Sequence, residues 1–277
     1  MRWSTRSAVP EAETAYWSLA RSALAESDPA AKCESVDQLW QAVATGDWWP
    51  SCPGEPRLLE CGRPARPELV PPNALKKRGL GSRQGRVALI HAVAHIEFNA
   101  INLGLDAALR FAGLPDDYYR DWLGVAADEA RHFRMLAGRL AELGARYGDL
   151  PAHNGLWDMA EKTAHDPLVR MALVPRVLEA RGLDVTPGMI KRLEQAEDAE
   201  TAALLKVILA EEEGHVAIGT RWFHHLCQER SLEPAATFEE LLFRYYQGQL
   251  RGPFNVPARR RAGFSEVELS RIGALGG

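Results

Sequence analysis

Long apolar runs are absent from this sequence of 277 residues, as are several other features that would mark a specialised class of protein. No segment approaches the roughly 20 apolar residues that span a bilayer, so we expect no membrane-spanning helix. The four cysteines show no C-x-x-C spacing, which disfavours a thiolate metal site, and in a reducing cytoplasm we expect them to be plain thiols. The formal net charge of −4 gives no global basic field for nucleic acid or anionic lipid.

The first residues also lack the apolar core of a secretory signal, so we expect a cytoplasmic protein. No segment of any length shows the alternation of apolar and polar residues that is typical of a β-strand. Apolar side chains instead recur every three or four positions through most of the chain. The sequence therefore predicts an all-α fold.

Residues 1–80 are predicted to form an N-terminal helical extension and a proline-rich strap, both packed on a bundle. Amphipathic helices are expected at 10–25, starting at Pro10, and at 34–47. Residues 48–76 contain seven prolines, which exclude regular structure. Apolar side chains in this stretch favour an ordered strap over a free linker. They are Trp48, Trp49, Leu58, Leu59 and Leu69.

Residues 81–230 are predicted to form a four-helix bundle, and residues 231–277 a C-terminal helix and tail. In the third bundle helix, Pro175 predicts a kink or widened turn one turn before Glu179. Gly182 is expected to break or loosen that helix, and Thr186-Pro187 to restart it as a continuation at an angle. The four predicted bundle helices are 82–111, 117–144, 166–181 and 198–229.

Two Glu-x-x-His steps, Glu129 to His132 and Glu212 to His215, lie on apolar helix faces. Positions three apart share one face of a helix, so each step presents a carboxylate and an imidazole together. Each step also follows a lone glutamate in the preceding helix, because Glu97 precedes Glu129 by 32 residues and Glu179 precedes Glu212 by 33. The pattern is an internal repeat of two hairpins.

Buried carboxylates are costly unless a cation neutralises them. Two helices with Glu-x-x-His and two with one Glu each can surround a pair of metal ions. Oxygen-rich ligands with one imidazole per metal favour two iron ions, with manganese as an alternative at one or both positions. The competing interpretation is that each Glu-His pair is an ordinary contact on a helix surface.

Residues around the predicted ligands have less specific interpretations. Asp128 and Glu211 each precede a ligand glutamate and are candidates to orient a metal-bound histidine. His91 and His95 lie off the face of Glu97, so we interpret them as second-layer or packing residues. The basic run Arg259–Arg261 is interpreted as a solvated tail, with a phosphate contact as the alternative.

At the ligand motifs the sequence resembles the ferritin-like superfamily of di-iron carboxylate proteins. It is similar, more narrowly, to a bacterial branch without an assigned function, from about residue 80 to the tail. It resembles MiaE-type tRNA hydroxylases more distantly. The stretches that carry the resemblance are Ala94–Glu97, Asp128–Phe133, Glu179–Arg181, Glu212–His215, Pro253–Asn255 and Ala262–Phe264.

The resemblance implies a bundle whose two iron ions activate O₂ as co-substrate for hydroxylation or a related oxidation. It implies the ligand and catalytic set Glu97, Glu129, His132, Glu179, Glu212 and His215. We therefore expect a di-iron oxygenase or hydroxylase acting on a small molecule or a modified nucleoside, with an electron donor as partner and a homodimer left open. The alternatives are a ferroxidase or iron-binding protein without an organic substrate, and a tRNA-modifying hydroxylase. The segment Gly182–Asp184 departs from the tRNA enzymes.

Overall fold

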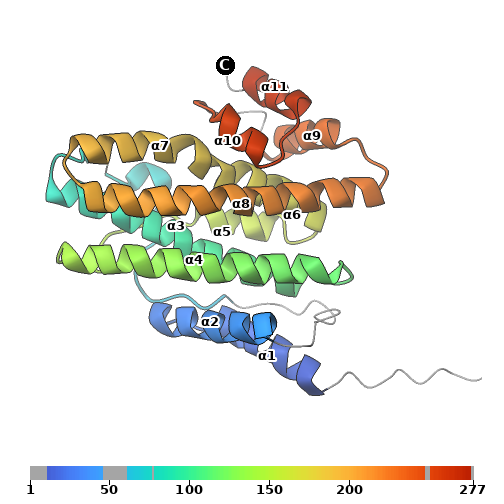
Figure 1. The fold of residues 1–277 in the computed structure, drawn as a ribbon, viewed down its shortest axis with the longest axis horizontal. Coiled ribbons are helices and arrows are strands. Elements are labelled where there is room, and N and C mark those ends of the chain that lie inside the picture. The colour runs from blue at the N-terminus through green and yellow to red at the C-terminus, as the bar shows by residue number, and fades with distance from the viewer. Residues whose placement is uncertain (1–10, 46–60, 77, 247–249, 276–277) are drawn as a thin grey trace, which may run out of the picture. The chain divides into compact units, whose positions relative to one another are not determined.

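The computed structural model describes residues 11–45, 61–76, 78–246 and 250–275, and these form an all-α helical bundle (Figure 1). This confirms the predicted fold class. Within the described residues the only β pairing is an isolated bridge between Leu69 and Ala152. The helices are α1 Glu11–Ala25, α2 Pro29–Thr45, the 3₁₀ turn η1 Pro72–Ala74, α3 Arg83–Arg110, α4 Asp116–Glu142, α5 Gly155–Lys162, α6 Pro167–Leu173, the π-helix η2 Val174–Glu179, α7 Ala180–Gln195, α8 Ala199–Glu229, α9 Pro234–Tyr246, α10 Val256–Arg261 and α11 Glu266–Leu275.

Some sequence predictions fall outside the described residues. These are Pro10 as a helix start and the part of the strap that holds Trp48, Trp49, Leu58 and Leu59. The later part of the strap is ordered. Its backbone exchanges hydrogen bonds with the segment after α4, because Val70 N donates to Ala152 O at 2.8 Å and Ala152 N donates to Glu68 O at 3.0 Å.

The chain forms two compact units, of which the first comprises residues 1–64 and 101–130. Here the α1–α2 hairpin packs on the first part of α4. Trp17 meets Tyr119 edge to face, with ring centroids 5.5 Å apart. A Cβ at Gly124 would lie 3.1 Å from the Trp40 ring, so the missing side chain allows this close packing. The buried amine of Lys32 donates to the carbonyls that end α1.

The second unit comprises residues 65–100 and 131–277. Helices α6 and α7 pack along α8, and α9, α10 and α11 form a smaller helical group in contact with it (Figure 1). α8 begins at an N-cap, Asp198, whose carboxylate accepts a hydrogen bond from Thr201 N at 3.0 Å.

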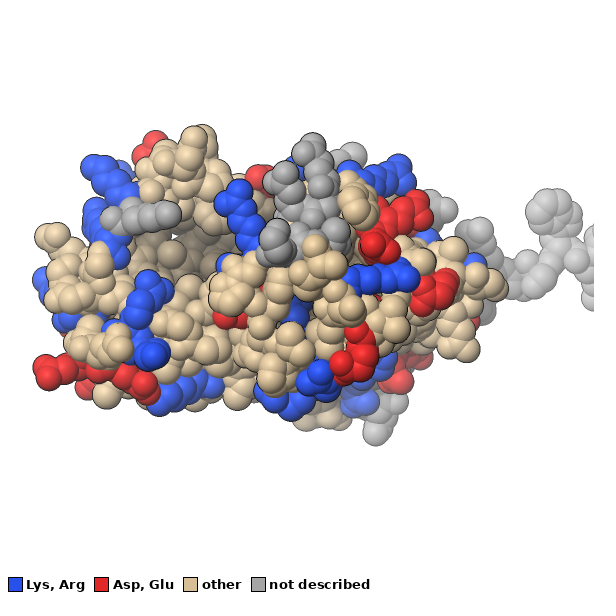
Figure 2. Space-filling view, turned by 90° about the horizontal axis from the view of Figure 1, so that it is seen from above, with Lys and Arg blue, Asp and Glu red and all other residues tan. Residues whose placement is uncertain are grey.

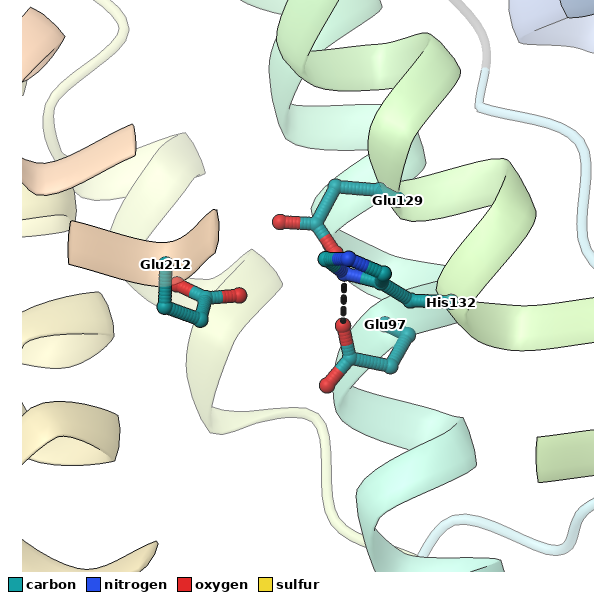
Figure 3. Close-up of side chains that lie close together, drawn as sticks. All are labelled: Glu97, Glu129, His132 and Glu212. Atoms are coloured by element: carbon teal, nitrogen blue, oxygen red, sulfur yellow. Dashed lines mark hydrogen bonds and ion pairs between the residues drawn. The ribbon is translucent and has the colours of Figure 1, made fainter. Parts of the chain in front are cut away.

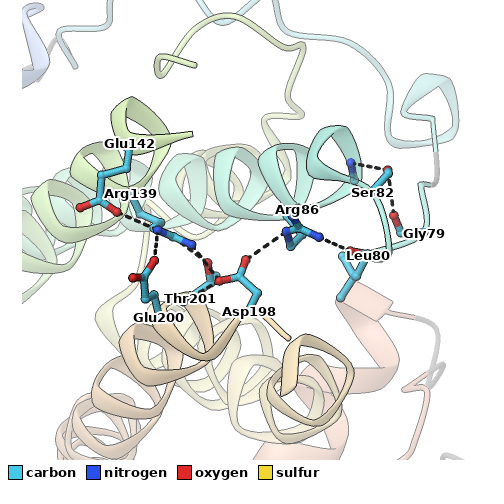
Figure 4. A network of polar contacts seen from close by, with 10 residues as sticks. Gly79, Leu80, Ser82, Arg86, Arg139, Glu142, Asp198, Glu200 and Thr201 are labelled. Atoms are coloured by element: carbon cyan, nitrogen blue, oxygen red, sulfur yellow. Dashed lines mark hydrogen bonds and ion pairs between the residues drawn. The ribbon is translucent and has the colours of Figure 1, made fainter. Parts of the chain in front are cut away.

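A polar network joins three long helices of this unit at one end (Figure 4). Arg139 of α4 donates to Oδ1 of Asp198 at 2.9 Å, and Arg86 of α3 reaches the other oxygen of Asp198 at 3.3 Å. Arg139 also contacts Glu200 and Thr201 at the start of α8. Because Asp198 is almost fully buried, this network fixes the axial register of α3, α4 and α8 relative to one another.

The third bundle helix is continuous from α6 through η2 into α7. The widened turn predicted at Pro175 is confirmed as the π-helix η2, which ends at Glu179. The predicted break at Gly182 and restart at Pro187 are wrong, because both residues lie inside α7. Pro175 sits against α8 where a Cβ at Gly219 would lie 2.3 Å from its ring. Only glycine at residue 219 leaves room for that proline.

The C-terminal segment explains why α7 tolerates a proline in its interior. Pro187 has no N–H, so the carbonyl of Leu183 loses its intrahelical partner. Asn255 Nδ2 donates to that carbonyl at 3.1 Å, and Asn255 N donates to the next residue, Asp184, at 2.8 Å. A side chain far along the chain therefore replaces the lost helical hydrogen bond.

The solvated basic tail expected at residues 259–261 is wrong in part. Arg259 is buried, lies in α10 and forms a salt bridge with Asp184 of α7 at 2.7 Å. Arg260 and Arg261 are exposed and pair with Glu266 and Glu213. In the sequence the three arginines look alike, but helix α10 places the Arg259 side chain in the interior of the protein.

α3 is long and apolar enough in composition to cross a membrane, but 67% of its most apolar window is buried in the protein. That burial is typical of the core helix of a bundle. Glu97 lies within it, 3% exposed.

Candidate metal centre

Three carboxylates and one imidazole meet between α3, α4 and α8 (Figure 3). Each offers one ligand atom, and these atoms all lie within 4.8 Å of one another. Glu97 comes from α3 and Glu212 from α8. Glu129 and His132 are three residues apart in α4, so the continuous helix places both on one face.

The helices hold these side chains by packing around them. Phe98 and Phe133 follow Glu97 and His132 in sequence, and their rings lie 5.5 Å apart. Glu97 and Glu129 are 3% and 0% exposed, and His132 is fully buried. The Glu212 side chain is 13% exposed, which makes it the most accessible of the four. The site therefore lies inside the protein with α8 on its accessible side.

His132 is fixed at both ring nitrogens. Nε2 lies 2.5 Å from Glu211 Oε2, and Nδ1 lies 3.3 Å from Glu97 Oε2. Arg131 also donates to Glu211 Oε2, at 2.5 Å. Burial alone would raise the pKa of Glu211, but the hydrogen bonds from Arg131 and His132 and their charges hold it below its usual value. An ionised Glu211 is the partner that orients a metal-binding histidine.

These residues fit a metal ion. A neutral His132 that donates a hydrogen bond from Nε2 to Glu211 would leave the Nδ1 lone pair facing a carboxylate oxygen of Glu97. His132 and Glu97 would then be suited to hold a cation. Three carboxylates close together in a buried site also need positive charge to offset their desolvation and repulsion. Carboxylate-rich sites with an imidazole suit iron or manganese.

The structure brings together four of the six predicted ligands. His215 is close to them, because its ring lies 5.9 Å from the His132 ring and its Nδ1 lies 3.7 Å from Glu212 Oε1. Glu179 is buried at the end of η2, which packs on α8. It does not belong to the group of atoms within 4.8 Å. The compact part of the site therefore consists of Glu97, Glu129 and His132 from the α3–α4 hairpin together with Glu212 from α8.

The structure also places Glu211 and His95, two residues that the sequence analysis singled out near the ligands. Glu211, a candidate to orient a histidine, contacts His132 rather than a histidine of its own helix. His95 is buried and lies outside the carboxylate cluster. Its ring bonds Tyr147 Oη at 2.9 Å and the carbonyl of His153 at 3.1 Å. Asp128 remains a prediction.

Sequence reasoning missed Arg131. It lies inside the first Glu-x-x-His step, and the sequence assigns it no role, yet it shares Glu211 with His132. Successive residues of a helix point about 100° apart, so the position of Arg131 next to His132 did not signal a shared partner. The partner on α8 is 80 residues away and has no local signature.

Comparison with known proteins places the chain in a family. The family model described as a protein of unknown function (DUF455) matches residues 25–270. The chain is also 41% identical over 270 residues to a protein of Haemophilus influenzae described as uncharacterized, which covers 94% of each sequence. No solved structure matches the chain. Because the family match spans most of the chain and the 41% identical relative is covered over 94% of its length, this chain belongs to the DUF455 family.

Proposed function

We propose that this protein is a ferritin-like, di-iron oxidoreductase that activates O₂ to oxidise an organic substrate. The observation that carries the proposal is the group Glu97, Glu129, His132 and Glu212, with ligand atoms within 4.8 Å in a buried site. His215 and Glu179 complete the proposed set, in which the two Glu-x-x-His steps each serve one metal. Manganese at either position fits the same donors.

Each residue has a distinct task in this proposal. Glu97, Glu129 and Glu212 supply negative charge, and His132 and His215 supply one imidazole per metal. These residues would hold a pair of iron ions, which would supply the redox chemistry needed to reduce O₂. Glu211 keeps the His132 ring in the orientation that points Nδ1 into the site. Close packing of α3 on α4 keeps bulk water from the buried carboxylates.

The remaining parts of the proposal concern location and partners. We propose a cytoplasmic protein that receives electrons from a separate donor and acts on a small molecule. The face shown in Figure 2 carries Lys and Arg beside Asp and Glu. The exposed pairs Arg260–Glu266 and Arg261–Glu213 neutralise part of the basic run. This mixture supports a small substrate over a nucleic acid, which needs a field of one sign.

Metal content tests the first level of the proposal. The protein is purified, loaded anaerobically with Fe(II), desalted and assayed for iron. We expect two iron ions per chain and a rise in melting temperature, since a ligand at 100 times its Kd stabilises the folded state by about 2.7 kcal/mol. Glu97→Gln and Glu129→Gln keep the side-chain shape but remove charge, and each is expected to lose at least half of the iron. Unchanged iron in both variants contradicts the site.

A matched control is available one residue from a ligand. Glu213 follows Glu212 in α8 but pairs with Arg261 at the surface. Glu213→Gln is expected to keep full iron content. The second level is tested by O₂ consumption after reduction: the iron-loaded protein should consume O₂, and Glu129→Gln should not. A shell-sized assembly in sizing chromatography would point instead to iron storage.

A further inference from the structure

A cavity of about 360 Å³ lies beside α3 in the second unit, apart from the carboxylate cluster. One wall is a face of α3 that includes Ala88, Ala92 and Ile96. The strap forms another wall and the segment 150–153 a third. His91 and His95 on this wall lie roughly 120° and 160° round α3 from Glu97. The cavity volume falls in the range of about 300–1,000 Å³ typical of small-molecule sites.

The polar side chains that line this cavity are hydrogen-bond donors. His91 Nε2 accepts from Gly148 N at 2.9 Å, so the ring proton is on Nδ1. His153 Nδ1 accepts from Gly155 N at 3.1 Å, so its ring proton is on Nε2. Burial lowers the pKa of His91, which agrees with a neutral ring that donates from one nitrogen.

Two cations of the strap add positive charge. Lys76 and Arg78 are exposed and line the cavity, and no acidic residue is among its lining residues. Among the described residues, no carboxylate forms an ion pair with either cation. An occupant with hydrogen-bond acceptors and negative charge is therefore favoured in this cavity.

The rest of the wall is apolar. Ile96 is 42% exposed although it lies in the middle of a long helix of the core. Leu75, Leu150 and Pro151 line the same space. Removing this apolar surface from water would favour an occupant that has an apolar part. An inorganic anion would leave that surface exposed, so it does not fit the whole cavity.

We propose that this cavity is a second ligand site, which binds a small organic anion with an apolar body, such as a medium-chain carboxylate. The Lys76 and Arg78 side chains and the His91 and His153 N–H groups bind the anionic group. Ile96 and the two alanines of α3 contact the apolar part. The site is not a metal site, because both nitrogens of His95 are engaged by Tyr147 and the His153 carbonyl.

Isothermal titration of the full chain with octanoate, octanol and octylammonium tests the proposal at pH 7.5. We expect one octanoate per chain, bound at least tenfold more tightly than octanol, and no binding of octylammonium. Lys76→Ala/Arg78→Ala should reduce octanoate affinity at least tenfold and leave octanol unchanged. The matched control Lys162→Ala/Lys191→Ala removes two exposed lysines elsewhere and should have no effect.

A variant whose larger side chain fills the cavity provides a second test of the proposal. Ala92 is exposed at the cavity wall, so Ala92→Trp should abolish octanoate binding while helix content and iron content stay as in the unmodified protein. Chelating the iron should leave octanoate affinity unchanged, which separates this site from the proposed function. Equal binding of octanoate and octylammonium, no octanoate binding, or undiminished binding to Ala92→Trp would overturn the proposal.

Discussion

The His132 imidazole donates a hydrogen bond from Nε2 to Glu211 Oε2, 2.5 Å away, although the two residues belong to α4 and α8. The adjacent residue Glu212 contributes to the carboxylate cluster. α8 therefore supplies both a proposed ligand and the group that orients a ligand on another helix. The site in the first hairpin depends on α8 for its geometry.

The first prediction concerns this orienting contact. Glu211→Gln removes the charge that accepts the His132 proton, so the ring loses a strong acceptor and its fixed orientation. Iron affinity is expected to fall about 10- to 100-fold, the usual effect of removing such a partner. Competition with a calibrated chelator measures this affinity. Glu213→Gln is the control, and equal iron affinity in the two variants would refute the orienting role.

A second prediction concerns the proline inside α7. Asn255→Ser keeps an oxygen that can cap α10 but removes the Nδ2 donor to Leu183 O. A buried carbonyl left without its partner costs about 1–3 kcal/mol. Chemical denaturation should show a loss of stability in this range. Pro187→Ala restores an N–H in the helix and should recover most of it in the Asn255→Ser background; additive effects of the two changes would be incompatible with this explanation.

The third prediction uses the contact between α8 and η2. Gly219→Ala places a Cβ 2.3 Å from the Pro175 ring, so one helix must move. Overpacking of this kind costs about 1–3 kcal/mol. Gly214→Ala on the same helix meets nothing within 4 Å and should be neutral or stabilising by up to about 1 kcal/mol. Thermal denaturation compares the melting temperatures of the two variants. Pro175→Ala should restore the stability of Gly219→Ala and should have no such effect on Gly214→Ala.

A fourth prediction concerns acid stability. Burial alone would raise the pKa of Glu268, but the hydrogen bond from His224, the charge of Arg176 and the amide of Ser265 hold it at about 2. Since the folded pKa lies below the unfolded value of 4.5, Glu268 stabilises the fold above pH 4.5. That contribution is lost as the pH falls from 4.5 to 2.

Denaturation of the unmodified protein and Glu268→Gln across this range measures the effect. The difference in unfolding free energy should be largest near pH 6, up to about 3 kcal/mol, and should shrink toward pH 2. A difference that stays constant with pH would show that the loss comes from packing around Arg176 rather than from the charge of Glu268.

Periodicity predicted the long helices well because their apolar faces are buried. The prediction of 82–111 compares with α3 at Arg83–Arg110, and 198–229 with α8 at Ala199–Glu229. Pro175 signalled the π turn correctly, since a proline disrupts the hydrogen-bond ladder wherever it lies in a helix. The candidate site followed from the same spacing, because Glu129 and His132 share a helix face in any fold that keeps α4 helical.

What the sequence could not predict depends on distant partners. Pro187 reads as a helix boundary until Asn255, 68 positions later, is seen to replace its hydrogen bond. Arg259 reads as a solvated charge until Asp184 is found beside it. The distance of Glu179 from the other ligands also depends on how η2 packs, which no local pattern encodes. Local rules therefore fail where long-range contacts supply the missing hydrogen bonds.

The dependence of α7 on Asn255 sets an order for folding during synthesis. Ribosomes produce the chain from the N-terminus, so α3 and α4 can pair long before residue 255 leaves the exit tunnel. Until then the Leu183 carbonyl lacks its donor and the helix that follows Glu179 is incomplete at Pro187. The turn of α7 around Pro187 therefore gains its last hydrogen bond only after residue 255 has been made, and a chain truncated before residue 255 should lose the roughly 1–3 kcal/mol that this bond protects.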